Sequence, residues 1–374
     1  MADSGFPHFM LKEIFDQPQA LRDAVVPRVS LTDAEICIAG ELRIRPNELR
    51  ALRRINIVAS GTSRHAGMAG QYMFQDLLHL FADVDYASEY EYRNPPIGPE
   101  EVTIVITQSG ETSDTLAAQR LARRKGSRTI AITNVVKSTV AKEADGVLYT
   151  HAGPEISIAS TKAFTAQMAV LFLLAIYLGQ VRGSLSREAL RTWIEELMAL
   201  PEKAETVLQC VEQCRQLADR FHRFEDFLFL GRAVHYPIAM DGALKLKEVS
   251  YVHAEGYPAG ETKHGPNALI DENLPVVLIA TCDQNDPGSV TRYKKSVSDL
   301  VGFKKQSARV IALATEGNTE ISRIADHTIF IPRAPELLAP ILEIIPLQLF
   351  AYHVAIRKGL DVDRPRNLVK SVQE

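Results

Sequence analysis

The 374-residue sequence is poor in the residues that build disulfide frameworks and metal sites. It contains four cysteines, which are Cys37, Cys210, Cys214 and Cys282. The spacing of Cys210 and Cys214 would place both on one helix face, but no further cysteine or clustered histidine accompanies them. We therefore expect reduced thiols, as in cytosolic proteins, and neither a metal nor a cofactor.

A strong net charge and a long apolar run are also missing. Lys and Arg number 42 and Asp and Glu number 46, which gives a net charge of -4. This near balance provides no general attraction to nucleic acid or to an anionic membrane. The longest apolar run, Ala169–Leu178, is too short to span a bilayer, and residues 1–23 do not resemble a secretory signal. We expect a cytoplasmic protein with no nucleic acid and no membrane as a partner.

Nucleotide-binding loops are a third absence, because the sequence has neither a Walker A loop nor a GxGxxG loop. What it does have is a regular alternation of strand-like and helical patterns. The first half predicts strands at 55–59, 102–107, 129–133 and 146–149, and helices at 65–81, 114–124, 138–144 and 161–178. Such alternation is typical of a parallel sheet covered on both faces. The last of these helices has an apolar face broad enough for a domain core or a subunit contact.

The second half repeats the first in outline, which suggests a duplication. It predicts strands at 227–230, 276–280, 310–313 and 328–331, and helices at 243–255, 290–303 and 336–356. We divide the chain into an arm or linker (1–45, with short helices at 9–15 and 20–25), a first α/β domain (46–183), a helical connector (184–222), a second α/β domain (223–360) and a tail (361–374). The connector is expected to break near Pro201, with Trp193 packed between its two helices.

Two loops of the first half have the composition of an anion-binding site. Ser60–Ser63 (SGTS) and Thr107–Thr112 (TQSGET) each follow a predicted strand and precede a predicted helix. Hydroxyls, a glycine and the free N–H groups of a helix start can hold an anion there, and a phosphate is the favoured ligand. The alternative is that these serines and threonines only cap helices. Two such loops in one sheet favour binding, because ligands of open α/β sheets bind at the carboxyl ends of the strands.

The stretch Asp241–Pro266 carries a second candidate constellation. Lys245 and Glu248 are three residues apart on a predicted helix and so project from one face. A segment broken by glycine and proline follows, and it leads into a loop that contains His264. A helix carboxylate facing a loop histidine is a plausible acid/base pair. The competing interpretation is a surface salt bridge plus a solvated histidine.

Several long motifs resemble one family. They are SGTSRHAGM, ITQSGETSDTL, EISIASTKAFTAQ, GALKLKEVSYVHAEGYPAGETKHGP, PLQLFAYHVA and DVDRPRNLVKSV, and they run nearly end to end. The chain is similar to the isomerase half of the glutamine–fructose-6-phosphate aminotransferases, or glucosamine-6-phosphate synthases. This resemblance implies an α/β fold of two SIS (sugar isomerase) domains, each a parallel-sheet αβα sandwich. It also implies an aldose–ketose isomerase that interconverts fructose 6-phosphate and glucosamine 6-phosphate.

The resemblance assigns roles residue by residue. The phosphate would be held by Thr107, Gln108, Ser109 and Thr112, with Thr62, Ser63, Ile158 and Ser160 near the sugar. Glu248 would move the proton between C1 and C2, His264 would assist ring opening, Lys370 would form an imine with the sugar ketone, and Lys245 would support Glu248. In this family the histidine comes from the neighbouring subunit, so a homodimer with shared active sites is expected.

The sequence also departs from the family pattern. Thr107 stands where a serine is usual, and Pro258 and Thr262 alter the loop before His264. Met1 is followed by Ala2 rather than by the nucleophilic cysteine of a glutaminase domain, so we expect no glutaminase and a possible separate ammonia source. The reaction could then be ammonia-dependent synthesis or deamination. Two alternatives stay open, which are a deglycase or isomerase for another amino-sugar phosphate and a non-catalytic sugar-phosphate sensor.

Overall fold

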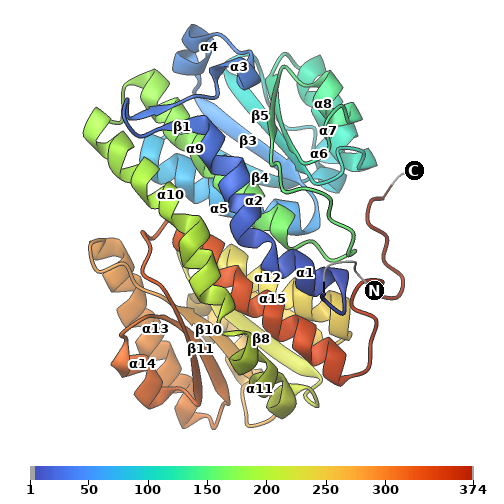
Figure 1. Cartoon of the computed structure of the whole chain (residues 1–374), viewed down its shortest axis with the longest axis vertical. Helices are drawn as coiled ribbons and strands as arrows, with labels where there is room; N and C mark the ends of the chain where they lie inside the picture. Colours follow the sequence, from blue (N-terminus) through green and yellow to red (C-terminus); the bar gives the residue numbers. More distant parts are fainter. Residues whose placement is uncertain (1–4, 373–374) are drawn as a thin grey trace. The chain divides into compact units, whose positions relative to one another are not determined.

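The computed structural model describes residues 5–372, so the first four residues of the predicted arm and the last two of the predicted tail lie outside the described part. The chain forms two compact units (Figure 1). The N-terminal unit comprises residues 17–155, 162–201 and 369–372, and the C-terminal unit comprises residues 5–16, 156–161 and 202–368. Each unit contains one five-stranded sheet. The boundaries predicted for the two α/β domains stay a prediction.

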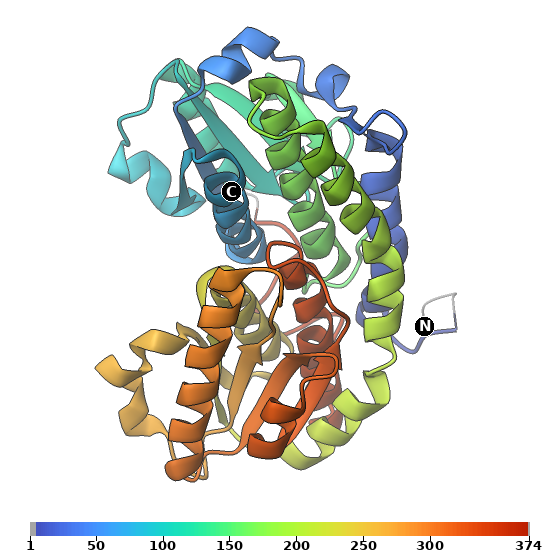
Figure 2. The same ribbon diagram turned by 90° about the vertical axis from the view of Figure 1, so that its left-hand side faces the viewer.

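The sheet of the N-terminal unit is parallel throughout and has the order β4-β3-β5-β6-β7. Its strands are β3 (Arg54–Ala59), β4 (Phe81–Tyr86), β5 (Glu101–Thr107), β6 (Arg128–Thr133) and β7 (Gly146–Tyr149). Helices α5 (Gly61–Leu78) and α9 (Lys162–Arg182) pack together on one face, and α6 (Ala87–Arg93), α7 (Ser113–Arg124) and α8 (Thr139–Glu143) cover the other (Figures 1 and 2). The near-continuous apolar strands suit burial on both faces.

Shorter elements complete this unit. They are α2 (Gln17–Val25), β1 (Val29–Ser30), β2 (Glu35–Ile36), α3 (Ala39–Leu42), α4 (Pro46–Ala51) and the first part of α10 (Arg187–Leu208). Helices α2 and α4 pack against α9.

The sheet of the C-terminal unit is also parallel, with the order β12-β11-β10-β8-β9. Its strands are β8 (Asp226–Gly231), β9 (His253–Pro258), β10 (Val276–Ala280), β11 (Val310–Thr315) and β12 (His327–Ile331). One face is covered by α11 (Val211–Phe221), α12 (Tyr236–Ser250) and α15 (Ala339–Arg357), and the other by α13 (Pro287–Lys305) and α14 (Thr319–Ile324) (Figure 1). Helix α1 (Phe9–Phe15) packs on α15.

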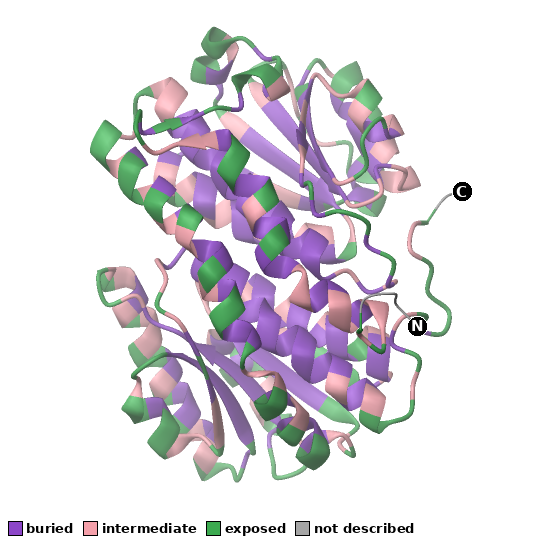
Figure 3. Cartoon of the chain, viewed as in Figure 1, coloured by how far each residue is buried: buried purple, intermediate pink, exposed green. Residues whose placement is uncertain are grey.

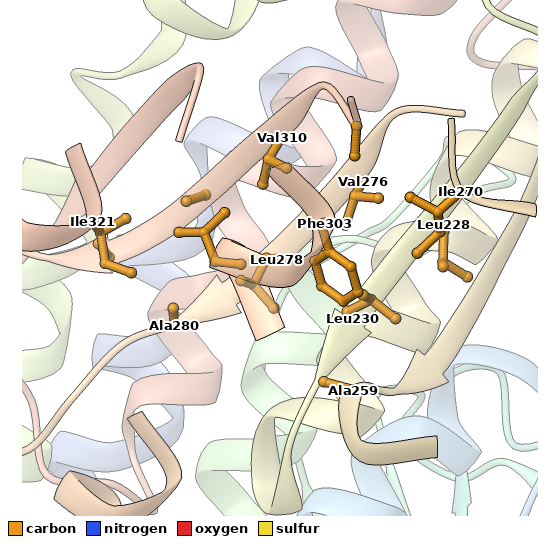
Figure 4. Close-up of a cluster of buried hydrophobic side chains, with 14 residues drawn as sticks. Leu228, Leu230, Ala259, Ile270, Val276, Leu278, Ala280, Phe303, Val310 and Ile321 are labelled. Atoms are coloured by element: carbon orange, nitrogen blue, oxygen red, sulfur yellow. The ribbon is translucent and has the colours of Figure 1, made fainter. Parts of the chain in front are cut away.

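The core under α13 shows how these strands are held. Leu228, Leu278 and Val310 come from three neighbouring strands and pack with Phe303 of α13 (Figure 4). Figure 3 shows the same distribution for both units, with strands and inner helices buried and the outer helix faces exposed. Burial of a large apolar side chain contributes roughly 1.5–3 kcal/mol to folding. The two sheets have the same topology, so the prediction of two parallel-sheet α/β domains is confirmed.

Several predicted elements have different limits in the structure. The helix expected at 243–255 ends at Ser250, because Tyr251 adopts a left-handed conformation (φ 60°). The segment expected to be broken by glycine and proline is the edge strand β9. A Cβ on Gly256 would lie 2.3 Å from the Cα of Met240, so this glycine lets β9 approach α12. Strand β4 was not predicted, and Phe81 was wrongly placed in the preceding helix.

The connector also differs from the prediction. Helix α10 continues through Pro201 and ends at Leu208, so the expected break is wrong. Buried Leu197 and Leu200 precede the proline and buried Ala204 follows it, so packing favours helix on either side despite the lost hydrogen bond. Trp193 does not pack between two connector helices. Its ring packs edge-on against the ring of Phe172 in α9, with the two ring centres 5.2 Å apart.

Helices α9 and α15 are the two helices of the described residues that resemble membrane spans in length and composition. Both are long and apolar enough to span a bilayer by length and composition, so the short apolar run was a poor reason to exclude one. In each helix 89% of the most apolar 18-residue stretch is buried inside the protein, which is typical of core helices in soluble proteins. Helix α9 is buried in the structure, which favours the domain core among the two alternatives left open for its apolar face.

Candidate functional site

The loop after β3 is the first part of the N-terminal unit's candidate site. Ser60 precedes α5 in an extended conformation, and Gly61 has a positive φ of 53°. Thr62 is buried, and the Ser63 hydroxyl accepts a hydrogen bond from the Gln167 amide at 3.0 Å. The Ser60 side chain makes no cap hydrogen bond to α5. The loop therefore places hydroxyls at the carboxyl edge of the sheet without using Ser60 as a helix cap.

The loop after β5 lies on the neighbouring strand and is rich in hydroxyls. The hydroxyl oxygens of Thr107 and Thr112 are 3.1 Å apart. The Gly110 amide donates to the Thr107 hydroxyl at 3.3 Å, and the Glu111 amide donates to the Ser109 hydroxyl at 3.2 Å. Thr112 stands at the N-cap of α7 but makes no cap hydrogen bond with its side chain. The interpretation of these residues as helix caps alone therefore fails at Ser60 and Thr112.

Sequence reasoning missed one residue within this loop, Glu111, and one directly after it, Ser113. Ser113 follows Thr112 in the first turn of α7, and its hydroxyl is buried without a hydrogen-bond partner within residues 5–372. The Glu111 carboxylate accepts from the Thr139 amide at 2.8 Å, and this contact with Thr139 lowers the pKa of Glu111. Its negative charge is thus bound at the start of α8. A sequence signal existed for Ser113, since it extends the hydroxyl-rich run.

Ile158 and Ser160 lie in the short segment of the C-terminal unit that follows Glu155. The buried Glu13 carboxylate accepts hydrogen bonds from the backbone amides of Ile156 and Ser157. The Ile158 amide donates to the Asp363 carbonyl at 3.1 Å. The segment is thus fixed from α1 on one side and from the tail on the other, which neither spacing nor composition predicted.

Lys245 and Glu248 meet on α12 as predicted. The Lys245 ammonium donates to the Glu248 carboxylate at 2.5 Å. The Lys245 side chain is 1% exposed and that of Glu248 is 22% exposed. Surface ion pairs keep both groups in water and contribute little, whereas here the ammonium is fully desolvated and the carboxylate alone reaches solvent. The interpretation as a surface salt bridge is therefore wrong.

His264 does not lie in an irregular loop as predicted. It ends a 3-10 helix, Ala259–His264, and its side chain is exposed. Within residues 5–372 its ring forms no hydrogen bond or ion pair, so the structure does not bring it into contact with Glu248. The buried Asp299 carboxylate forms an ion pair with Arg232 and also lies 3.5 Å from the ammonium of Lys263, which belongs to this 3-10 helix. The contact with Lys263 helps to fix the helix.

The tail makes specific contacts along its described length. Asp363 accepts from the amides of Phe9 and Met10 at 3.0 and 2.8 Å, and so caps α1. The Arg366 amide donates to the Tyr251 hydroxyl at 2.8 Å, and the Arg366 guanidinium lies 4.1 Å from the centre of the Tyr251 ring. Arg366 thus fixes the tail backbone, whereas Asn367 is exposed with a positive φ of 62°.

The last described residues contact the loop after β5 in the N-terminal unit. Lys370 donates to the Glu155 carboxylate at 2.7 Å, and the other Glu155 oxygen accepts from the Ala163 amide at 3.1 Å. The hydroxyls of Ser371 and Ser109 are 3.1 Å apart, and the Ser113 amide donates to a tail carbonyl. Lys370 therefore lies at the proposed phosphate loop. Glu155, which opens the EISIASTKAFTAQ motif, was missed as its partner.

Comparison with known proteins gives consistent results. A family model described as SIS domain matches residues 48–177 and 225–358. Glutamine–fructose-6-phosphate aminotransferase [isomerizing] from Chlorobaculum tepidum is 47% identical over 368 residues, which cover 98% of this chain and 58% of that protein. The protein of that name from Methanosarcina acetivorans is 46% identical, with 99% and 58% covered. This chain thus spans 58% of the length of these two relatives.

A solved structure with clear sequence identity also matches this chain. It is the C-terminal domain of glucosamine-fructose-6-phosphate aminotransferase from Francisella tularensis, with a TM-score of 0.90 and 34% sequence identity. The match covers 98% of this chain and 100% of that structure.

Gly110 provides a test of the loop after β5. Its φ is 72°, and a Cβ there would lie 2.1 Å from the Ser138 hydroxyl. We expect Gly110→Ala to distort the loop and to weaken binding of inorganic phosphate at least about tenfold, measured by isothermal titration calorimetry. Gly126→Ala is the control, because Gly126 also has a positive φ (87°) but a Cβ there meets only Pro99 at 4.0 Å. Left-handed strain of roughly 1–2 kcal/mol affects both variants, so equal phosphate affinities would contradict the assignment.

Proposed function

This chain belongs to the SIS domain family, in the group of glutamine–fructose-6-phosphate aminotransferase isomerase domains, and from that premise we propose that it interconverts fructose 6-phosphate and glucosamine 6-phosphate. The observation that carries the proposal is the Lys245–Glu248 pair. It presents a partly exposed carboxylate beside a buried ammonium. A sugar isomerisation needs one base that can take a proton and return it, and such a carboxylate can do so.

The proposed steps give each candidate residue one role. Thr107, Gln108, Ser109 and Thr112 bind the phosphate, and Thr62, Ser63, Ile158 and Ser160 contact the sugar. His264 assists opening of the ring, after which the Lys370 amine attacks the C2 ketone and forms an imine with loss of water. Ammonia then displaces Lys370 at C2. Glu248 takes the proton from C1 and returns it at C2, and Lys245 holds the Glu248 carboxylate in place.

The nitrogen source forms a separate part of the proposal. Because the chain spans 58% of the relatives' length, glutamine-dependent chemistry does not transfer with the match. We propose that this 374-residue chain uses free ammonia, or ammonia from a separate protein, or runs in the deaminating direction. A cytoplasmic location fits this metabolic role.

The alternatives differ in what they require of the site. A deglycase or isomerase for another amino-sugar phosphate would use the same Glu248 with a different C2 substituent. A non-catalytic sensor needs the phosphate loop alone. The desolvated Lys245 is costly to bury, and a sensor would not require a carboxylate held beside it, so the enzyme is favoured.

Glu248→Gln tests the proposed base. A carboxamide cannot take up and return a proton, so we expect isomerisation to fall roughly 100- to 10,000-fold, while phosphate binding changes little. The unfolding temperature should fall, because the buried Lys245 ammonium loses its counter-charge. The assay measures glucosamine 6-phosphate formed from fructose 6-phosphate with ammonium, and with glutamine in its place. Glu255→Gln, an exposed carboxylate on β9, is the matched control. Wild-type turnover by Glu248→Gln would remove Glu248 from the mechanism, and failure of every sugar phosphate in wild type would favour the sensor.

Lys370 can be tested by trapping. Borohydride reduces an imine, so treatment of the chain with fructose 6-phosphate should attach the sugar to Lys370, as located by mass spectrometry. Lys370→Arg keeps a positive charge for Glu155 but cannot form the imine, so it should show no adduct. We also expect a chain that lacks residues 365–374 to be inactive while its unfolding temperature changes little. An adduct on another lysine, or full activity of the shortened chain, would argue against this role.

Assembly is the last part of the proposal. We propose a homodimer in which His264 serves the neighbouring subunit, which is supported by its exposure and by the absence of a partner for its ring within residues 5–372. Inactive Glu248→Gln and His264→Ala chains should regain part of the wild-type activity when mixed, because one site of each hybrid dimer is intact. Proven subunit exchange without recovery would show that His264 acts within its own chain.

A further inference from the structure

Each sheet has one place where a ligand crevice is expected. If the five strands of each sheet are numbered by their order in the chain, neighbouring strands in the sheet follow the order 2-1-3-4-5 in both units. The chain therefore changes direction across the sheet between β3 and β5 in one unit, and between β8 and β10 in the other. Ligands of such sheets bind beyond the carboxyl ends of the strands at this point. In the N-terminal unit this point is flanked by the loop after β3, proposed to contact the sugar, and the loop after β5, proposed to bind the phosphate.

The corresponding loops of the C-terminal unit contain a different set of groups. The loop after β8 leads to His235, which is buried. The loop after β10 leads to α13, whose first turns carry the buried Ser289 and the partly exposed Arg292. All three side chains converge on one carboxylate, that of Glu336, which lies ahead of α15.

The Glu336 carboxylate is surrounded as a bound anion would be. One of its oxygens accepts from the His235 ring nitrogen at 3.1 Å and from the Arg292 side chain at 2.6 Å, and the other accepts from the Ser289 hydroxyl. The Glu336 side chain is 8% exposed. A hydroxyl in the first turn of a helix, an arginine and a protonated imidazole are groups that bind phosphate in other proteins.

The charges of this cluster are fixed. Burial alone would lower the pKa of His235, but the carboxylates of Glu343 and Glu336 raise it to about 10. Burial would likewise raise the pKa of Glu336, but its hydrogen bond with His235 contributes most to lowering it to about 2. The second ring nitrogen of His235 lies 2.8 Å from Glu343, which also accepts from Thr281. Glu336 is therefore an anion held by cationic and hydroxyl donors at neutral pH.

We propose that the Glu336 carboxylate is an internal anion. It occupies the position in the C-terminal unit's sheet that corresponds to the phosphate site of the N-terminal unit, so that the chain binds one sugar phosphate.

The same proposal predicts what happens when this carboxylate is removed. Replacing Glu336 by a small residue opens a site for a tetrahedral oxyanion of the phosphate class, built from His235, Ser289 and Arg292. The comparison of the two sheets depends on the proposed phosphate role of the loop after β5, whereas the opened site does not.

A purely structural role for Glu336 makes a different prediction. If the cluster served only to neutralise buried charge, any small anion or none would replace the missing carboxylate. If the cluster has the geometry of a phosphate site, inorganic phosphate should stabilise the altered protein more than chloride or formate at the same ionic strength. The choice of anion therefore separates the two roles.

The test compares Glu336→Ala, which empties the site, with Glu336→Gln, which fills it with an uncharged group of the same shape. We expect both variants to unfold at a lower temperature than wild type. Phosphate at about ten times its Kd should raise the unfolding temperature of Glu336→Ala by roughly 2 °C beyond the shift seen in wild type. It should give no such extra shift in Glu336→Gln, or in Glu336→Ala combined with Arg292→Gln. An equal effect of formate, or no extra effect of phosphate, would overturn the proposal.

The wild-type chain supplies a measurement that does not depend on how the variants fold. Equilibrium dialysis with fructose 6-phosphate should give one bound molecule per chain, and two would overturn the proposal. Ser109→Ala in wild type should abolish that binding, and its failure to do so would count against the proposed function. The extra phosphate effect in Glu336→Ala should persist when Ser109→Ala is added, so the two proposals fail separately.

Discussion

The arrangement of polar groups in this protein follows from the parallel sheet. Strands such as β5 and β10 are buried on both faces, so they carry apolar side chains along most of their length. Polar chemistry can gather only where the strands end, and in a parallel sheet all carboxyl ends lie at one edge. The helix that follows each strand begins at the same edge, with its amide groups free. The hydroxyl loops of one unit and the Glu336 cluster of the other both occupy this edge.

Much of this could be predicted from the sequence because strands, loops and helix starts are local features. The runs ending at Ala59 and Thr107 marked both hydroxyl loops, and three-residue spacing was sufficient to bring Lys245 and Glu248 together. Burial could not be predicted in the same way. Whether an ion pair on a helix is exposed to water depends on which other elements pack over it. The desolvation of Lys245 comes from the fold around α12.

The errors have related causes. A glycine-containing segment suggested a loop, but Gly256 is needed for the close contact of β9 with α12. For the apolar helix α9 a domain core and a subunit contact stayed open, because its sequence cannot show that neighbouring helices of the same unit cover it. His235 gave no signal at all, since its partners Glu336 and Glu343 are about a hundred positions away. Contacts at that separation are set by topology and not by local pattern.

The cap on α1 has a consequence for how the chain is made. The amides of Phe9 and Met10 are bound by Asp363, and the residues joined in this way are 354 and 353 positions apart. Synthesis at roughly 5–20 residues per second takes on the order of a minute or less to cover that interval. Until Asp363 emerges from the ribosome, the first helix has no acceptor for these amides, and a seven-residue helix is unstable alone. Helix α1 is therefore synthesised well before the carboxylate that caps it, and it acquires this cap only after residue 363 has been added.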